Sequence, residues 1–126
     1  MAGQYDGGQG FDTLVLNFSG TQNINLSTLV NHAHGIERID LGNTHFLDNS
    51  TSLRIDSLSD ITSIVDAGVS RLLVQGSTTD SIKLATSANL AKVAVSSQDF
   101  VYFDVYETAG SDIQLWLQQG MAVSQV

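Results

Sequence analysis

Residues 7–15 read Gly-Gly-Gln-Gly-Phe-Asp-Thr-Leu-Val, and this stretch decides how the chain begins to fold. Its three glycines have no Cβ to block a positive φ, so the segment predicts a tight turn in which backbone carbonyls converge. Asp12 adds a carboxylate at the end of that turn, and Leu14 then points inward as the first strand begins. The sequence therefore predicts a cluster of oxygen atoms immediately before a buried strand.

Oxygen atoms gathered at a glycine turn are typical of calcium sites. The nonapeptide fits the pattern Gly-Gly-x-Gly-x-Asp-x-apolar-x of calcium-binding β-roll repeats at every specified position. Ca²⁺ takes roughly six to eight oxygen ligands, many of them carbonyls, so one turn supplies only part of a shell. The predicted calcium ligands are Asp6, Gly8, Gly10 and Asp12. The alternative is a glycine turn that lacks the second loop needed to complete a site.

A longer run carries a resemblance to a known family. Residues 10–16 read Gly-Phe-Asp-Thr-Leu-Val-Leu, residues 24–26 read Ile-Asn-Leu, and residues 35–41 read Gly-Ile-Glu-Arg-Ile-Asp-Leu. This run resembles the C-terminal region of RTX (repeats-in-toxin) proteins and is most similar to large bacterial adhesins exported by type I secretion. The resemblance is close over residues 1–41 and looser through 74–84.

The resemblance implies Ca²⁺ as the cofactor and a secreted or cell-surface location. It implies two partners, the upstream RTX repeats of a parent chain and the type I secretion machinery. It also implies that residues 1–16 form a terminal calcium turn and first strand, and that residues 17–126 form a β-rich cap next to the secretion signal. Residues 42–48 hold fewer glycines and acidic or amide residues than the family usually has there, so a second metal turn is not predicted.

Composition narrows the class of protein. The length of 126 residues fits a single domain with its own core. The net charge of −8, from 13 acidic and five basic residues, argues against nucleic acid as a partner because few cations could neutralise phosphates. No apolar run reaches the length of a membrane span, so membrane insertion is not predicted. The start of the chain does not read as a secretory signal peptide, and the absence of cysteine excludes disulfides and thiolate zinc sites.

Short alternating segments predict an all-β domain with one or two short helices. Polar turns followed by alternating strands recur at uneven spacings, which favours a degenerate β-roll or solenoid-like coil, or a sandwich-like cap, after the calcium turn. Helices are expected at 59–68 and, more briefly, at 27–33. The expected strands cover residues 13–16, 23–26, 36–41, 52–56, 71–75, 81–84, 92–95, 101–106 and 113–117.

Other candidate sites have simpler interpretations. His32 and His34 would share one side of a strand, as a metal pair requires, but the segment reads as a helix end entering a loop, and His45 stands alone. Glu37 and Asp40 lie three positions apart on one predicted strand and so face opposite sides, which does not make an acid–base pair. No nucleophile elbow is present. The sequence therefore does not predict an enzyme.

Aromatic residues gather near the end of the chain, at positions 100, 102, 103, 106 and 116. One interpretation is core packing, with Val101, Phe103 and Val105 facing inward together with alternate residues of 113–117. The other is an exposed platform between Tyr102 and Trp116 that binds a glycan or peptide. The sequence thus predicts a non-catalytic, calcium-binding cap and secretion-associated domain of an RTX adhesin. The alternatives are a glycan- or peptide-binding module and a structural spacer without metal.

Overall fold

The structure, a computed structural model, describes residues 5–6, 10–16, 21–41, 50–66 and 68–126. Strands make up most of it, with two short α-helices and one 3-10 turn, which confirms the prediction of an all-β chain with short helices. The elements are β1 (Tyr5–Asp6), β2 (Thr13–Val15), β3 (Thr21–Asn25), α1 (Leu26–Leu29), β4 (Ala33–His34), β5 (Arg38–Asp40), β6 (Ser50–Ile55), α2 (Leu58–Ile64), β7 (Arg71–Gln75), β8 (Ser81–Leu84), η1 (Thr86–Ala88), β9 (Ala91–Gln98), β10 (Val101–Glu107), β11 (Gln114–Gln118) and β12 (Ala122–Gln125).

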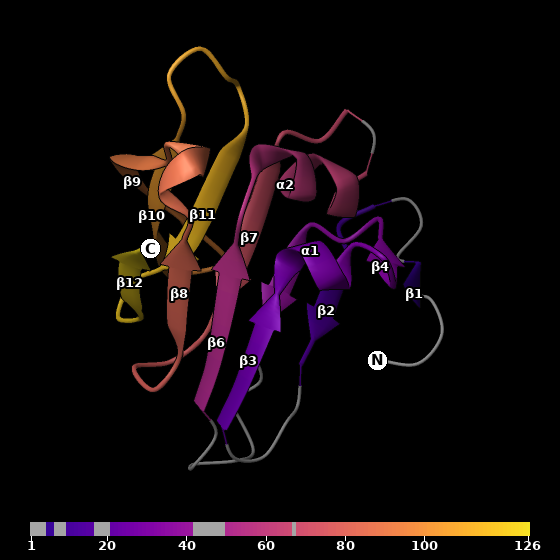
Figure 1. Cartoon of the computed structure of the whole chain (residues 1–126), viewed down its shortest axis with the longest axis horizontal. Coiled ribbons are helices and arrows are strands. Elements are labelled where there is room, and N and C mark those ends of the chain that lie inside the picture. Colours follow the sequence, from indigo (N-terminus) through magenta and orange to yellow (C-terminus); the bar gives the residue numbers. More distant parts are fainter. Residues whose placement is uncertain (1–4, 7–9, 17–20, 42–49, 67) are drawn as a thin grey trace.

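The chain winds back and forth between two sheets (Figure 1). A six-stranded sheet has the order β2-β5-β7-β11-β10-β9, and a four-stranded sheet has the order β12-β8-β6-β3. The pairs β2–β3, β5–β6, β7–β8 and β11–β12 each place one strand in either sheet, and we call each pair a winding. From the second winding on, each strand pairs in parallel with the strand of the preceding winding that lies in the same sheet. A third, two-stranded sheet joins β1 to β4.

An antiparallel hairpin interrupts the windings between the third and the fourth. Strands β9 and β10 form it and extend the six-stranded sheet beyond β11. Its tip holds Asp99 and Phe100 at φ values of 55° and 66°, which suit the tight turns that join antiparallel strands. Arg38 in β5 reaches this tip, with its Nη2 atom 2.8 Å from Oδ2 of Asp99. The hairpin is therefore tied to the second winding.

The main core lies between the two sheets because alternate side chains of each strand point inward. In the six-stranded sheet, Leu14, Ile39, Val74 and Leu117 stand in register on neighbouring strands, and all four are buried. In the four-stranded sheet, β6 alternates half-buried with buried residues along its whole length. Each winding therefore adds one apolar layer to a continuous core.

A second, smaller cluster lies on the opposite face of the six-stranded sheet. It consists of Leu73, Phe103, Val105 and Trp116, all buried. The rings of Phe103 and Trp116 have centroids 5.9 Å apart, and the guanidinium carbon of Arg71 lies 4.4 Å from the Trp116 ring centre. Burial of Trp116, which is 8% exposed, agrees with the core interpretation of this aromatic and removes it from any exposed platform.

The expected grouping of these side chains was wrong. Phe103 and Val105 are buried, as are Leu115 and Leu117, but the two pairs belong to different clusters. Register explains this, because Val105 lies opposite Trp116 while Leu117 lies opposite Asp104. Alternation predicts which residues of one strand share a face, whereas only the pairing between strands decides which faces meet.

Local predictions agree with the structure to within a few residues. The helix expected at 59–68 is α2 and ends earlier, at Ile64, where the following residue Val65 adopts an extended conformation. The turn of helix expected in 27–33 is α1. The sequence does not predict strands β1, β4 and β12, and β4 includes His34, where it predicts a loop. None of the described helices is long and apolar enough to cross a membrane.

Candidate metal centre

Three carboxylates converge at one end of the six-stranded sheet. Asp12 immediately precedes β2, Glu37 immediately precedes β5, and Asp66 follows α2 shortly before β7. One oxygen atom from each lies within 4.8 Å of the other two. The segments that lead into the first three windings thus meet at a single point, and the arrangement could hold a metal ion.

Asp12 and Glu37 occupy positions that leucine fills in the later windings. Arg38 pairs with Leu73 in β7, so Glu37 is equivalent to Leu72, which in turn pairs with Leu115 of β11. Asp12 is equivalent to Glu37 by the pairing of β2 with β5. The same inward-facing position is therefore leucine in the third and fourth windings and acidic just before the first and second. Carboxylates at such positions weaken a core, and departures of this kind are expected at functional sites.

Backbone hydrogen bonds hold the three segments around Glu37. The amide of Asp12 donates to Oε1 of Glu37 at 3.0 Å, and the amide of Asp66 donates to Oε2 at 3.0 Å. In return, the amide of Glu37 donates to the carbonyl of Asp12 at 3.0 Å. Each carboxylate oxygen can accept more than one bond, so these contacts leave lone pairs available to a cation. Glu37 therefore fixes the geometry of the cluster.

The electrostatics of the cluster favour a bound cation. Burial raises the pKa of Glu37. The two backbone amides lower that pKa, while the negative charges of Asp66 and Asp12 raise it further. Glu37 is only 3% exposed, and water therefore screens these charges poorly. A divalent cation would offset the desolvation and the mutual repulsion of all three carboxylates.

One oxygen atom of the cluster is buried without a partner. Within the part of the chain that the structure describes, Oδ2 of Asp12 accepts no hydrogen bond. A buried carboxylate oxygen left in this state costs free energy, and such atoms are uncommon in folded proteins. A metal ion between Asp12, Glu37 and Asp66 would give this oxygen the partner that it lacks.

The predicted ligands meet different outcomes in the structure. Asp12 joins the cluster, and Gly10 adopts a φ of 97° two positions before it, as a glycine turn requires. The backbone of Asp6 lies in β1 and pairs with His34, but the side chain of Asp6 lies outside the described residues. Gly8 also lies outside them. The ligand roles of Asp6, Gly8 and Gly10 remain predictions.

Glu37 and Asp66 were missed as ligands, although the sequence carries a signal for the first. Residues 10–16 and 35–41 share the pattern Gly-x-acidic-x-apolar-x-Leu, which places Glu37 where Asp12 stands. In the sequence analysis, Glu37 is paired only with Asp40, which does not belong to the cluster. Asp66 has no such signal, because its position depends on how the segment after α2 returns to the sheet.

The remaining candidates do not belong to the described carboxylate cluster. His32 is half-buried and His34 is exposed, and neither belongs to the carboxylate cluster found among the described residues. His45 lies outside the described residues. Phe100 and Tyr102 are exposed, at 103% and 63%, so two of the five aromatics expected near the C-terminal end remain available to a partner.

Comparison with known proteins adds no family to these observations. No family model, no curated protein and no solved structure matches the chain. The features of the chain that bear on function are the carboxylate cluster and the motif-bearing residues 1–41.

Proposed function

We propose that Asp12, Glu37 and Asp66 bind Ca²⁺ and that the domain is a non-catalytic, calcium-stabilised cap of an RTX-type adhesin. The observation that carries this proposal is the position of Asp12. It is the aspartate of the glycine-rich motif, and its carboxylate lies within 4.8 Å of two further carboxylates from neighbouring windings. The carboxylate of a motif that fits the calcium-repeat pattern thus lies beside two carboxylates that could complete more of a shell.

The chemistry of the cluster favours calcium among common biological metals. All three side chains offer hard anionic oxygens, and the described cluster includes no histidine or cysteine of the kind that zinc and copper prefer. Ca²⁺ accepts irregular shells of about six to eight oxygens, so backbone carbonyls of the glycine turn and water can complete the set. Mg²⁺ requires a smaller, nearly octahedral shell and gives up its water reluctantly.

The winding of the chain supports a degenerate β-roll rather than a sandwich. Sandwiches are built mainly from antiparallel strands, whereas here all four windings pair in parallel across both sheets. Strands β2 and β3 are the edges of their sheets, where strands of upstream calcium repeats could pair. The antiparallel β9–β10 hairpin would end the roll on the side of the six-stranded sheet.

Calcium binding would couple folding to location. At the low calcium concentration of a cytosol, the three carboxylates repel one another and leave the chain less stable and suited to export. Outside the cell, an ion that binds only the folded chain adds its binding free energy to folding. The ion would join the segments that contain Asp12, Glu37 and Asp66, and so fasten the first three windings together.

Thermal unfolding tests this proposal. Adding Ca²⁺ to chelator-treated protein should raise the melting temperature progressively, because a ligand specific for the folded state stabilises it in proportion to the logarithm of its concentration. Mg²⁺ at equal concentration should have a much smaller effect. Identical melts in calcium and in chelator would leave the spacer without metal as the better description of the domain.

A further inference from the structure

We propose that the outer face of the four-stranded sheet binds a glycan that carries carboxylate groups, through Arg54 and Lys83. This face lies on the opposite side of that sheet from the main core and is separate from the carboxylate cluster. Figure 1 shows it toward the viewer, with β12, β8, β6 and β3 side by side. The inference is independent of calcium binding.

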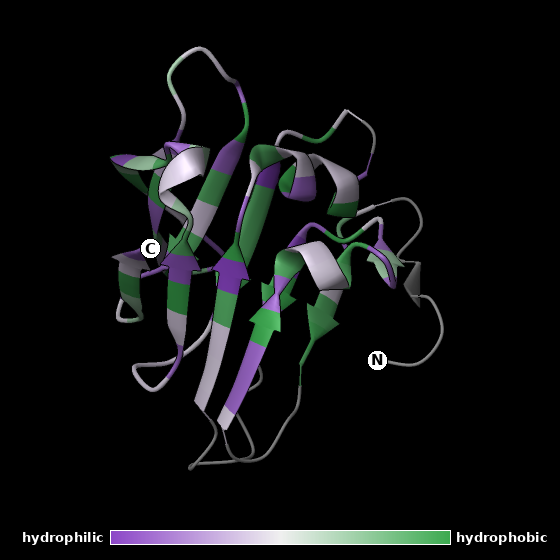
Figure 2. Cartoon of the chain, in the orientation of Figure 1, coloured by the Kyte–Doolittle hydropathy of each residue, from purple (hydrophilic) through white to green (hydrophobic). Residues whose placement is uncertain are grey.

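Parallel register arranges the outward side chains of this face in rows. Asn25 of β3, Arg54 of β6 and Lys83 of β8 are paired on neighbouring strands, and Ser124 of β12 continues the row. Hydrophilic bands at the ends of β6 and β8 line up across the sheet in Figure 2. Side chains of adjacent strands in a row are about 4.8 Å apart. Two cations therefore stand side by side at a spacing close to one sugar unit of an extended polysaccharide.

The neighbouring row supplies hydrogen-bonding groups. Asn23, Ser52 and Ser81 are paired across β3, β6 and β8, with the small Ala122 after them. A shallow groove of about 200 Å³ crosses this part of the face. It is lined by Asn23, Ile24, Asn25, Ser52, Arg54 and Lys83. Amides and hydroxyls next to two cations suit a ligand that combines hydroxyl groups with carboxylates.

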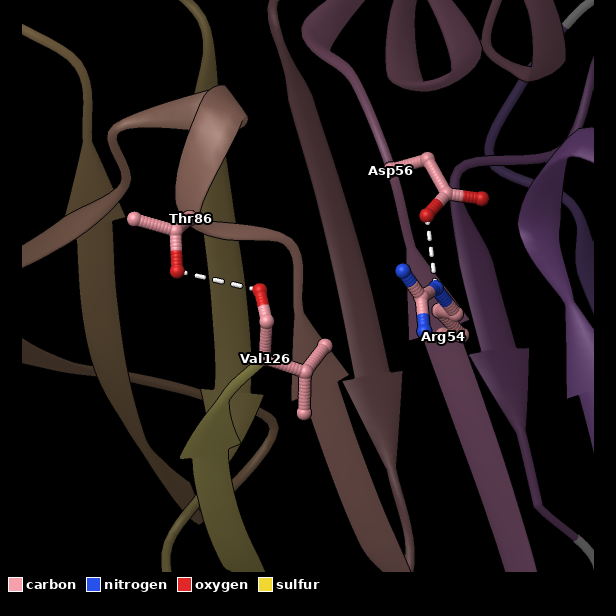
Figure 3. A network of polar contacts seen from close by, with 4 residues as sticks. All are labelled: Arg54, Asp56, Thr86 and Val126. Atoms are coloured by element: carbon pink, nitrogen blue, oxygen red, sulfur yellow. Dashed lines mark hydrogen bonds and ion pairs between the residues drawn. The ribbon is translucent and has the colours of Figure 1, made fainter.

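The charge of this face contrasts with that of the chain. Arg54 and Lys83 are two of only five basic residues in a chain of net charge −8. Arg54 is paired with Asp56, whose Oδ1 lies 2.6 Å from its Nε, and this pair stands at the end of β6 in Figure 3. At the β12 side of the face, the Thr86 hydroxyl donates a hydrogen bond to the backbone oxygen of Val126, which is also drawn in Figure 3. Among the described residues Lys83 forms no ion pair, so its charge is available to a ligand.

The composition of the face selects among classes of ligand. Protein interfaces typically have an apolar, aromatic-rich centre, whereas the two rows of outward residues carry only amide, hydroxyl and basic side chains and one alanine. A nucleic acid would require several more cations to balance its phosphates, against a repulsive net charge. A glycan with spaced carboxylates needs only the two cations and the polar rows.

Calorimetric titration with tri-galacturonic acid tests the inference, with maltotriose as the neutral counterpart. Tri-galacturonic acid should bind with an affinity that falls as salt is added, and maltotriose should bind much more weakly. Arg54→Gln and Lys83→Gln should each weaken binding about fivefold or more. Asp56→Asn should strengthen binding, because it releases Arg54 from its ion pair. The control Lys92→Gln removes the same charge from β9 in the other sheet and should leave affinity unchanged.

The titration is run both in chelator and in calcium, so that bridging by an ion at the carboxylate cluster is separated from binding at this face. Equal affinities in the two conditions support the inference even if calcium fails to bind the cluster. Absence of binding, equal binding of maltotriose, or unchanged affinity in both Arg54→Gln and Lys83→Gln would overturn it. Tighter binding of a single-stranded oligonucleotide of equal charge would assign the face to nucleic acid instead.

Discussion

Replacing Phe103 with alanine is expected to cost about 3–5 kcal/mol of the free energy of unfolding. The side chain is fully buried, and it packs with Trp116 in the smaller cluster on the far face of the six-stranded sheet. The variant loses the burial of the whole ring and leaves a cavity beside Trp116, and both effects lower the free energy of unfolding. Urea unfolding of the wild type and Phe103→Ala, both in calcium, measures the difference.

Tyr102→Ala is the matched control for this prediction. Tyr102 precedes Phe103 on the same strand but is 63% exposed, so its loss should change stability by less than about 1 kcal/mol. Similar costs for the two variants would contradict the assignment of faces in β10. A large cost for Tyr102→Ala alone would mean that the exposed aromatic face is the one that packs.

The variant Asp12→Asn is expected to change stability in opposite directions with and without calcium. In chelator it should stabilise the protein by about 1 kcal/mol, because it removes one of three charges that repel one another at short range. At a calcium concentration about 100 times the dissociation constant, the wild type should gain about 2.7 kcal/mol, and the variant should gain much less. Urea unfolding in the two conditions gives both values.

Asp112→Asn provides the control for net charge. Asp112 is exposed and lies outside the cluster, so its substitution changes the charge of the chain equally without touching the site. It should leave the calcium response intact. A loss of stability in chelator for Asp12→Asn, with an undiminished calcium response, would show that the Asp12 carboxylate is a structural group and not a ligand.

Local features of this fold were predictable from the sequence. Alternation in 52–56, 81–84 and 101–106 placed strands close to their observed bounds, because a strand with one buried face must alternate. The apolar spacing of 61–65 indicated α2 for the same kind of local reason, whereas Gly68, expected just past the helix end, lies four residues beyond Ile64. The motif at 7–12 identified Asp12 because the conformation of a tight turn depends on residues next to one another in the sequence.

Features that depend on contacts between distant segments were not predictable in this way. Strand β12 has little apolar alternation of its own and forms by pairing in parallel with β8. The separation of Phe103 from Leu115 into different clusters depends on the register of β10 against β11. Asp66 reaches the carboxylate cluster only because α2 returns the chain beside the turn before β5. Such placements depend on how all the strands pair in the folded chain, and no short segment of sequence specifies them.

Calcium titration by isothermal calorimetry tests the central claim most directly, with the wild type and Asp66→Asn compared under identical conditions. Asp66 lies outside the glycine motif and owes its place in the site to the fold alone. We expect the wild type to bind calcium in the turn before β2 and Asp66→Asn to bind it at least about tenfold more weakly, because a charged ligand is lost from the shell. Equal affinities for the two proteins, or no binding heat in the wild type, would contradict the claim that Asp12, Glu37 and Asp66 form one calcium site.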